Sequence, residues 1–389
     1  MSDLAEEHFL DPAEPQIYPT LARARETCPV FHSPAHGRNP LPRRNVTRWE
    51  DVDRVLRDPI RFSSQPVLDD IPHTGSKILL GLDGEEHRRY RALVKDAFSP
   101  ASLRVLEREV VVPVIQALLA PICERGHAEL ISEVVHVFPV QIICHILGVP
   151  VDRMEDFQRW GTDMILGSYN ETAAAAAAAA MTEVLEPIVN DRRQEPREDL
   201  ISRLVTAEVD GKQLDDEALY SFLRLLLPAG ADTTWRAFGS LLVALLKDQK
   251  TLAAVTADRS LVPAVVEESV RWESPAPRLV RITTEDVEIA GCPISAGTVL
   301  EVWPGSANRD ESRFEQPDEW KPGRPESHLA FGVGPHVCLG INLARMELHS
   351  GLNAVLDALP NLRFDPAYPV PVITGHALRG PSELHVLFG

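Results

Sequence analysis

The chain has 389 residues and a formal net charge of -18; 44% of its residues are hydrophobic and 25% are charged. It is long enough to bury a large core, and this balance is typical of a globular protein and excludes a disordered chain. The negative charge argues against nucleic acid or an anionic membrane as a partner of the whole molecule.

The composition also indicates a compartment. The five cysteines are scattered and form no CxxC pair, which favours a reducing cytoplasm over a disulfide-stabilised secreted protein. The first residues, MSDLAEEHFL, have neither the basic nor the apolar region of a secretion signal. No run of about 18 or more apolar residues is present, so we expect no membrane-spanning helix and a cytoplasmic protein.

The N-terminal part of the chain carries weak local signals. Residues 1–48 are rich in proline and lack a clear periodicity. A short helix is expected over residues 50–56, where the apolar side chains fall on one side. Residues 62–82 are predicted to form a long loop with exposed apolar side chains, among them Ile78 and Leu79.

A helical pattern dominates the chain from residue 85 to about residue 248. Proline, glycine or charged turns separate its segments. Helices are expected near 85–97, 101–124, 133–147, 152–168, 172–193 and 215–248. Residues 173–180 are all alanine, the residue with the highest helix propensity. That run predicts either a plain helix with a thin face or a helix that leaves room beside a pocket.

The C-terminal part of the chain mixes the two periodicities. A helix is expected over residues 263–272 and a longer one over residues 339–359, and alternating stretches between them indicate short strands. We therefore predict a mainly α fold with a small β region (α+β) in a single domain over residues 1–389. Its helical parts are expected at roughly 85–272 and 339–359, and its β-containing parts at roughly 38–48, 278–303 and 362–388.

The helix expected over residues 215–248 contains the stretch LLLPAGADTTWRA, which interrupts an apolar run with helix-weakening and polar residues. Gly230 and Thr233 share one helical stripe with Leu226, and Asp232 adjoins it. One interpretation is an ordinary kinked helix in which threonine hydroxyls bond back to the backbone. The other is that the helix contributes these polar groups to a site.

The segment FGVGPHVCLG, residues 331–340, is the most informative in the chain. Glycines surround Cys338 just before a predicted helix, whose N–H groups and dipole favour a thiolate. A buried free cysteine would be the ordinary explanation. The order Phe331, Gly332, Gly334, His336, Cys338 and Gly340, however, resembles the haem-thiolate loop of the cytochrome P450 family, F-G-x-G-x-H-x-C-x-G.

The resemblance extends over essentially the whole chain. Residues 340–347 resemble the start of the family's helix behind the cysteine. Glu268 and Arg271 fit its E-x-x-R motif, Arg324 resembles the third member of that cluster, and residues 308–310, NRD, match a segment between them. The resemblance implies a buried structural network behind the haem, whereas the two motif residues alone would indicate only a surface ion pair at i,i+3.

The resemblance implies haem b as the cofactor, held between the 215–248 helix and the cysteine helix, with Cys338 as the iron ligand. His87 and Arg91, one helical turn apart, are expected at one haem propionate. Arg281 is expected at the other, together with His336. Whether Arg278 faces haem or substrate stays open. Further expected cofactor contacts are Ala229, Gly230, Phe331, Gly332 and Gly340.

The implied activity is that of a soluble, bacterial-type monooxygenase. Asp232 and Thr233 match the family's A-G-x-[DE]-T motif and are expected to deliver protons for the activation of dioxygen. One oxygen atom would enter a small apolar organic substrate, with electrons from a ferredoxin and an NAD(P)H-dependent ferredoxin reductase. The alternatives are a haem-thiolate peroxygenase or isomerase, which the Asp232–Thr233 pair argues against, and a non-catalytic haem sensor.

Two regions depart from the family pattern, since residues 39–44, NPLPRR, make a poor strand and Pro228 is not a fixed family feature. Because a ferredoxin is usually acidic, a local basic patch is expected for docking, with Arg88, Arg89, Arg104 and Arg108 as candidates. The substrate pocket is expected to be lined by residues from 67–82, 165–182, 225–233, 277–280 and 375–378.

Overall fold

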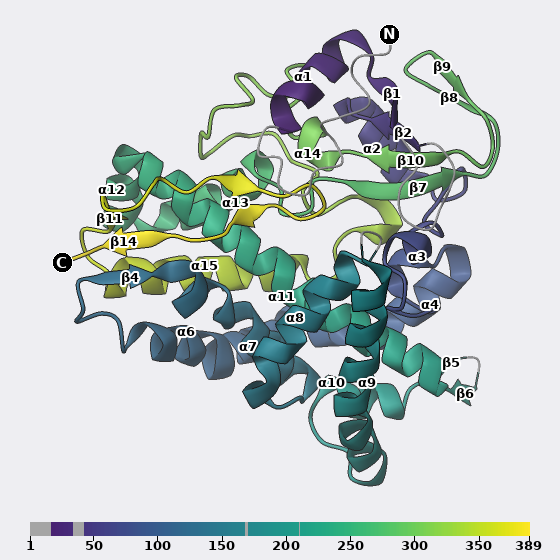
Figure 1. Ribbon diagram of the computed structural model, residues 1–389, viewed down its shortest axis with the longest axis horizontal. Coiled ribbons are helices and arrows are strands. Elements are labelled where there is room, and N and C mark those ends of the chain that lie inside the picture. The colour runs from purple at the N-terminus through teal and green to yellow at the C-terminus, as the bar shows by residue number, and fades with distance from the viewer. Residues whose placement is uncertain (1–16, 34–42, 168–169, 210) are drawn as a thin grey trace.

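The computed structural model describes residues 17–33, 43–167, 170–209 and 211–389. Helices form most of these residues, and small sheets lie beside the helical bundle (Figure 1). This confirms the predicted mainly α fold with a small β region.

The helical region between residues 84 and 257 is more finely divided than the periodicity predicts. It contains α4 (Gly84–Val94), α5 (Pro100–Leu106), α6 (Val112–Leu119), α7 (Val137–Leu147), α8 (Met154–Ile165), α9 (Glu171–Gln194), α10 (Leu200–Val205), α11 (Asp216–Lys247) and α12 (Gln249–Ala257). The expected helix 101–124 is α5 and α6 joined by a π-helical stretch, and α10 and α12 lie outside the predicted segments. The starts of α9 and α11 are capped as their sequences suggest, by the side chains of Asn170 and Asp215.

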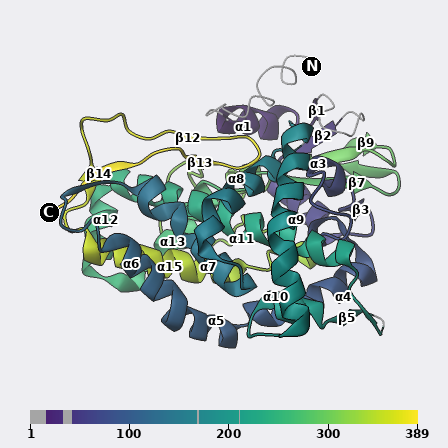
Figure 2. The ribbon, with the colours of Figure 1, turned by 60° about the horizontal axis from the view of Figure 1, so that its bottom comes forward.

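Helix α11 runs through the middle of the bundle, where α7, α8, α13 (Val262–Trp272) and α15 (Ile341–Ala358) pack around it (Figure 1 and Figure 2). Most of its residues are buried, as expected for a helix that is apolar on nearly all sides. Pro228 lies inside it without ending it. The helices predicted over 263–272 and 339–359 are confirmed as α13 and α15.

A five-stranded sheet forms the largest β part. Its strands follow the order β1 (Val30–Ser33), β2 (Arg43–Val46), β10 (Val299–Val302), β7 (Leu279–Thr283) and β3 (Phe62–Ser63). β2 and β10 are parallel, and the other neighbours are antiparallel. Helices α1 (Ile17–Thr27), α2 (Trp49–Arg57) and α14 (Pro304–Ala307) lie beside this sheet in Figure 1.

Strand β2 forms where a weak strand was expected, although residues 38–42 of that expected β part lie outside the described residues. Arg43 is fully buried in it and pairs with Asp70 on α3 (Val67–Asp70), with 2.6 Å between Nη2 and Oδ1. Ion pairing and sheet hydrogen bonds therefore stabilise a strand that has few apolar side chains. This tertiary contact is invisible to local sequence patterns.

Two N-terminal predictions need correction. Residues 17–27 form helix α1 within the segment expected to lack periodicity, and α1 buries Tyr18 and Leu21. In the expected loop 62–82, Ile78 and Leu79 are buried rather than exposed, because their side chains pack into the main hydrophobic core. The helix expected over 50–56 is confirmed as α2.

A three-stranded sheet and three strand pairs complete the described fold. The sheet has the order β11 (Arg363–Phe364), β14 (His385–Leu387) and β4 (His127–Glu129). The pairs are β5 (Glu208–Val209) with β6 (Lys212–Gln213), β8 (Val287–Ile289) with β9 (Cys292–Ile294), and β12 (Ile373–Thr374) with β13 (Gly380–Pro381). Through β14, the C-terminal end of the chain pairs with β4, which precedes α7.

Helix α9 contains the alanine run. By length and composition alone, it is the one helix among the described residues that is long and apolar enough to cross a membrane. Its apolar side packs on α8 and α10, and Ala174, Ala177 and Met181 are buried there. At its end Arg192 forms a buried ion pair with Asp199, with Nε and Oδ2 2.6 Å apart. These contacts make α9 a packing helix of the bundle.

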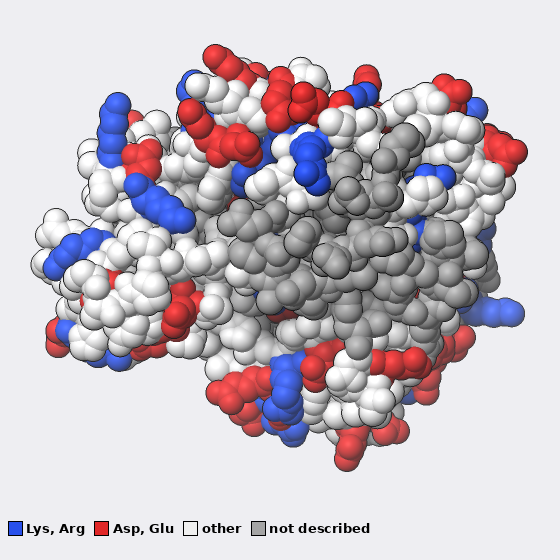
Figure 3. Space-filling model, turned by 45° about the horizontal axis from the view of Figure 1, so that its top comes forward, with Lys and Arg blue, Asp and Glu red and all other residues white. Residues whose placement is uncertain are grey.

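The surface carries both signs of charge. Figure 3 shows acidic and basic side chains interspersed over one face of the molecule, without a continuous basic patch on the described part of that face. The whole chain has a formal net charge of -18.

Candidate active site

The loop that carries Cys338 is fixed by its own backbone. The Cys338 N–H donates to the Phe331 carbonyl at 2.9 Å, and α15 begins just after Gly340. Gly332 and Gly334 have φ angles of 65° and 73°, a region that favours glycine. At Gly334 a Cβ atom would also lie 2.6 Å from the Leu56 carbonyl oxygen on α2. Two of the glycines are therefore required by the loop's own path.

Opposing effects act on the pKa of the Cys338 thiol. Burial raises its pKa above the ordinary value, while the Gly340 N–H and the guanidinium groups of Arg91 and Arg345 favour the thiolate. The Arg91 Nη2 atom also donates to the Val337 carbonyl at 2.7 Å, which ties α4 to the cysteine loop. The donors around the sulfur are those that a thiolate ligand requires.

Two arginines and two histidines surround this loop, and we call them the cation group: Arg91, Arg281, His87 and His336. The rings of His87 on α4 and His336 lie 4.2 Å apart between centroids. Burial and the charges of His336, Arg91 and Arg281 lower the pKa of His87 to about 4. Arg281 on β7 is 5% exposed, and burial lowers its pKa to about 10. The structure thus brings together all four residues predicted for the propionates.

Only one carboxylate balances this cation group among the described residues. Asp83 lies 3.6 Å from His336, between Oδ1 and Nε2, and it accepts a hydrogen bond from Ser63 at 2.5 Å. Burial raises the pKa of Asp83, but the bonds from His336 and Ser63 outweigh this and lower it. The buried Nε2 atom of His87 has no hydrogen-bond partner in the described part of the chain. The geometry therefore fits an anionic ligand.

Helix α11 presents small and polar residues toward one side. Ala229 is exposed although Leu227, Pro228 and Ala231 are buried, and Thr233 is partly exposed. The Thr233 hydroxyl donates to the Ala229 carbonyl at 3.1 Å. Gly230 differs from the expectation, since a Cβ there would lie 2.9 Å from Ile143 on α7. Its small size serves helix packing, and Ala229 and Thr233 form the open side.

Asp232 points to another side of α11. It is 4% exposed, and its Oδ1 accepts a hydrogen bond from the Trp235 indole N–H at 2.8 Å. Thr162 on α8 lies 3.5 Å from its Oδ2. The predicted proton donor is therefore buried between helices, next to Thr233 in sequence but turned away from it.

Comparison with known proteins identifies the family to which the chain belongs. A family model described as "Cytochrome P450" matches residues 162–367. The chain belongs to the cytochrome P450 family. It is similar to erythromycin C-12 hydroxylase of Saccharopolyspora erythraea, with 35% identity over 333 residues that cover 82% of this chain and 83% of that protein.

Two further relatives of this P450 agree. Steroid C26-monooxygenase of Mycolicibacterium smegmatis is 32% identical over 352 residues, covering 88% of this chain and 87% of that protein. The structure of cytochrome P450 CYP109Q5 from Chondromyces apiculatus matches with a TM-score of 0.88 at 34% identity, covering 99% of this chain and 98% of that chain. This P450 is accordingly a haem-thiolate monooxygenase with haem b as its cofactor.

Residues of this P450 fit that cofactor. The thiol of Cys338 is flanked by positive charge, the cation group offers partners for propionates, and Gly340 has open space where a Cβ would be. Within the described ranges, no cluster of three or more His, Cys, Asp or Glu side chains could hold a separate metal ion. The Cys338 thiolate stays the expected iron ligand because of its place in the haem-thiolate motif.

The E-x-x-R residues form the network that the motif predicts. Glu268 and Arg271 on α13 are both nearly fully buried and joined by two hydrogen bonds of 2.7 and 2.8 Å. Arg324 reaches Glu268 at 3.1 Å. Arg271 also donates to the carbonyls of Asn308 and Pro317 at 2.7 and 2.9 Å. The cluster therefore holds the segment that leads into the cysteine loop.

A second group of ion pairs next to the cysteine loop was not predicted from the sequence motifs. Glu267, next to Glu268, accepts hydrogen bonds from Arg345 on α15 at 2.7 Å and lies 3.2 Å from His328. Burial raises the pKa of Glu267, but these partners outweigh it and lower the pKa to about 2. Arg345 also lies over the ring of Phe331, 5.1 Å from its centroid. The only sequence signal was a charge on each of two predicted helices.

Arg278 pairs with two carboxylates. Its Nη1 atom lies 2.9 Å from Glu301 on β10 and 3.7 Å from Asp70, and Arg43 contacts the same two carboxylates. Arg278 thus belongs to a buried ion-pair cluster between α3 and the sheet.

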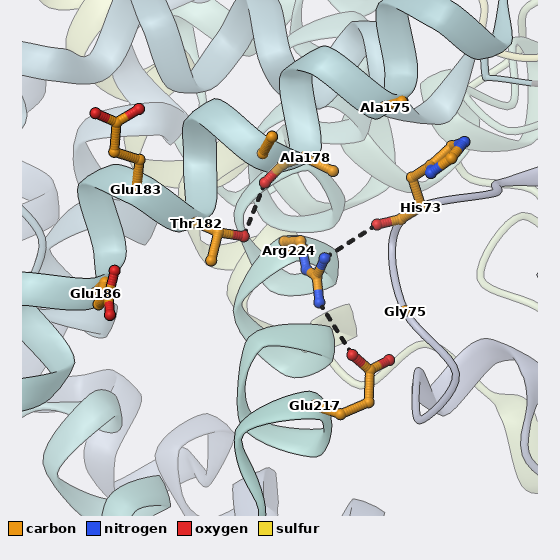
Figure 4. Close-up of a pocket in the computed structure, with 10 residues that line it drawn as sticks. His73, Gly75, Ala175, Ala178, Thr182, Glu183, Glu186, Glu217 and Arg224 are labelled. Carbon is orange, nitrogen blue, oxygen red and sulfur yellow. Dashed lines mark hydrogen bonds and ion pairs between the residues drawn. The ribbon is translucent and has the colours of Figure 1, made fainter.

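The alanine run also borders a pocket. A pocket of about 630 Å³ is lined by Ala175, Ala178 and Ala179 of α9, by the loop at His73 and by residues of α11 (Figure 4). Within it, the Arg224 guanidinium donates to the His73 carbonyl at 3.3 Å and lies 3.6 Å from Glu217. Both interpretations of the run hold, since one alanine face packs and another leaves room. Arg224 precedes Thr233 by about two and a half helical turns, so this pocket adjoins a different side of α11.

Proposed function

We propose that this P450 inserts one atom of dioxygen into a small, mainly apolar organic substrate, using electrons from a separate ferredoxin and an NAD(P)H-dependent ferredoxin reductase. The observation that carries the proposal is the exposed Ala229–Thr233 side of α11 in a fold whose cysteine loop is built for a thiolate ligand. Two relatives are named for the oxidation of organic compounds, erythromycin and a steroid.

Bound haem supplies the site for dioxygen and the redox chemistry. Cys338 would hold the iron and donate electron density to it. His87, Arg91, Arg281 and His336 would hold the propionates, because charge-assisted hydrogen bonds to carboxylates are strong. Burial and the nearby charges of His336, Arg91 and Arg281 lower the pKa of His87, and the propionates would offset those charges.

The oxygen-side roles belong to two neighbouring residues of α11. The Thr233 hydroxyl, which bonds to the Ala229 carbonyl, can rotate to donate to or accept from a polar group on its open side. Asp232 is buried and can supply a proton from behind that residue. Positioned proton donors of this kind typically contribute about 10²–10⁴-fold to a rate.

Three of the four arginines proposed for docking the electron donor are already paired with carboxylates. Arg88 and Arg89 pair with Glu85, and Arg108 pairs with Glu109. Arg104 is exposed and has no ion pair among the described residues. Of the four candidates, Arg104 therefore offers the clearest uncompensated charge for an acidic electron donor, and we propose that the donor docks near it. We also propose that the protein is cytoplasmic.

The test separates this function from its alternatives. Purified protein is offered a panel of apolar compounds, and those that shift the haem Soret band are incubated with dioxygen plus ferredoxin and reductase, with hydrogen peroxide, or with neither. Product that forms efficiently only with dioxygen and the electron donors supports the proposal. Efficient product formation with peroxide alone would identify a peroxygenase, product without any oxidant an isomerase, and binding without product a sensor.

A further inference from the structure

Asp232 is a buried acid with an unusual set of partners. It is 4% exposed, and it has no ion-pair partner in the described part of the chain. Its one short hydrogen bond comes from the Trp235 indole N–H, at 2.8 Å, whereas Thr162 Oγ1 lies 3.5 Å away. Because a buried carboxylate needs donors, the indole N–H is the group that determines where this carboxylate points.

Trp235 is itself held firmly. It is 8% exposed, the ring of His136 meets it edge-on with centroids 4.9 Å apart, and the Arg236 guanidinium lies 4.3 Å above it. Burial lowers the pKa values of both His136 and Arg236, and the charge of Asp232 opposes that effect in each. His136, just before α7, and Arg236 on α11 are the titratable neighbours of Trp235 and Asp232 among the described residues. The facing residues of α8, Gln158 and Thr162, are neutral.

The indole turns Asp232 away from the oxygen side. Consecutive helix residues point about 100° apart, so Asp232 and Thr233 face different directions. On the Asp232 side there is a small cavity of about 10 Å³, lined by Gln158, Gly161, Pro228 and Ala231 as well as Asp232. Such a volume holds about one water molecule. A water molecule in this cavity would lie next to the Asp232 carboxylate and could return a proton to it.

We propose that Trp235 is a positioning residue for proton delivery, whose indole N–H anchors the Asp232 carboxylate beside this cavity. The inference rests on the proposed role of Asp232. Without the anchor, the carboxylate loses its fixed orientation and its contact with the proton supply. The loss therefore affects the dioxygen reaction, which needs delivered protons, and leaves the peroxide reaction, which brings its own.

The direct test is Trp235→Phe, which keeps the ring against His136 and Arg236 but removes the N–H. Dioxygen-supported turnover should fall about tenfold, a part of the 10²–10⁴-fold that a positioned acid contributes, while peroxide-supported turnover should stay within about twofold of wild type. Trp160→Phe is the matched control, since Trp160 is also 8% exposed and packs on Phe157 of α8. An equal fall in both reactions would reduce Trp235 to a packing residue and overturn the proposal.

A second measurement needs no turnover. In protein with ¹⁵N-labelled tryptophan, reduced and bound to carbon monoxide, the indole signal that Trp235→Phe removes is assigned to Trp235. Asp232→Ala should move that signal strongly and those of the other indoles little; an unmoved signal would show that the hydrogen bond is absent. If Asp232→Ala itself leaves dioxygen-supported turnover intact, the proposed role of Asp232 fails. If Asp232→Ala impairs it and Trp235→Phe does not, only the positioning role fails.

Discussion

The imidazole rings of His87 and His336 lie 4.2 Å apart, centroid to centroid, and 249 positions separate them in the chain. Burial and neighbouring cations hold both imidazoles neutral by lowering their pKa values, that of His87 to about 4. Two uncharged histidines can therefore lie against each other, with ring planes tilted by 33°, beside Arg91 and Arg281. Adding a proton to either would place another cation there.

This pair predicts a pH-dependent stability of the haem-free protein. The pKa of His87 in the folded chain, about 4, is below the value of about 6.5 for an unfolded chain. The unfolded state therefore binds more protons between these values, and stability falls as the pH drops from about 6.5 through about 4. His87→Gln should lose less stability over that window. Urea unfolding at a series of pH values checks this, and identical slopes for the two proteins would contradict it.

A second prediction concerns the iron ligand. Cys338→His should bind haem weakly or through nitrogen, so its reduced carbon monoxide complex should lose the strongly red-shifted Soret band of a thiolate-ligated haem. Cys292→Ser, in the β8–β9 hairpin, is the control and should keep that band. A thiolate spectrum in Cys338→His would show that another cysteine binds the iron.

A third prediction concerns the network behind the haem. Glu268→Ala leaves Arg271 buried and unpaired, which costs about 3–5 kcal/mol of the free energy of unfolding. The variant should be mostly insoluble or free of haem. Asp53→Ala breaks an exposed pair with Arg57 at the same N···O distance range, 2.8 Å, and should cost less than about 1 kcal/mol. Chemical unfolding and haem content per chain are the measurements, and equal behaviour of the two variants would rule out a structural role.

The parts of the site that could be predicted are those whose residues lie close together in the sequence. Cys338 and its glycines, and Glu268 with Arg271, lie within ten residues of one another in their motifs, so spacing alone indicated their roles. Arg43 and Glu301 are 258 positions apart, and their shared cluster with Asp70 depends on the folded sheet. The packing of Gly230 on Ile143 likewise needs the crossing of α11 and α7. We did not predict the Asp232–Trp235 bond, although it has the i,i+3 spacing of a helix within the stretch ADTTW.

That buried cluster of Arg43, Asp70, Arg278 and Glu301 gives a fourth prediction. Glu301→Gln removes one charge between two buried arginines and should lower the free energy of unfolding by about 3–5 kcal/mol. The double variant Arg278→Met with Glu301→Leu removes a whole pair and should recover a large part of that loss, because apolar side chains of similar volume can replace a buried ion pair. Losses that simply add would show that the two residues act independently.

The last prediction returns to the open side of α11. Thr233→Ala removes the hydroxyl that bonds to the Ala229 carbonyl on the exposed side of the helix, but it leaves Cys338 and its cation neighbours untouched. The variant should still bind haem and substrate and still accept electrons. Without the hydroxyl, no side chain at this position directs protons to the dioxygen site. NAD(P)H consumption should therefore continue while product per NAD(P)H falls severalfold and hydrogen peroxide rises.

The neighbouring threonine provides a matched control for this change. Thr234 also donates to a carbonyl four residues earlier, that of Gly230, at 3.2 Å, but it is 5% exposed and faces the packed interior. Thr234→Ala should lower stability slightly and leave the ratio of product to NAD(P)H unchanged. Peroxide-supported turnover should be similar in both variants, since peroxide brings oxygen and protons together. If Thr233→Ala couples electrons to product as well as wild type, or if Thr234→Ala uncouples equally, α11 is only a bent packing helix and the role assigned to Thr233 fails.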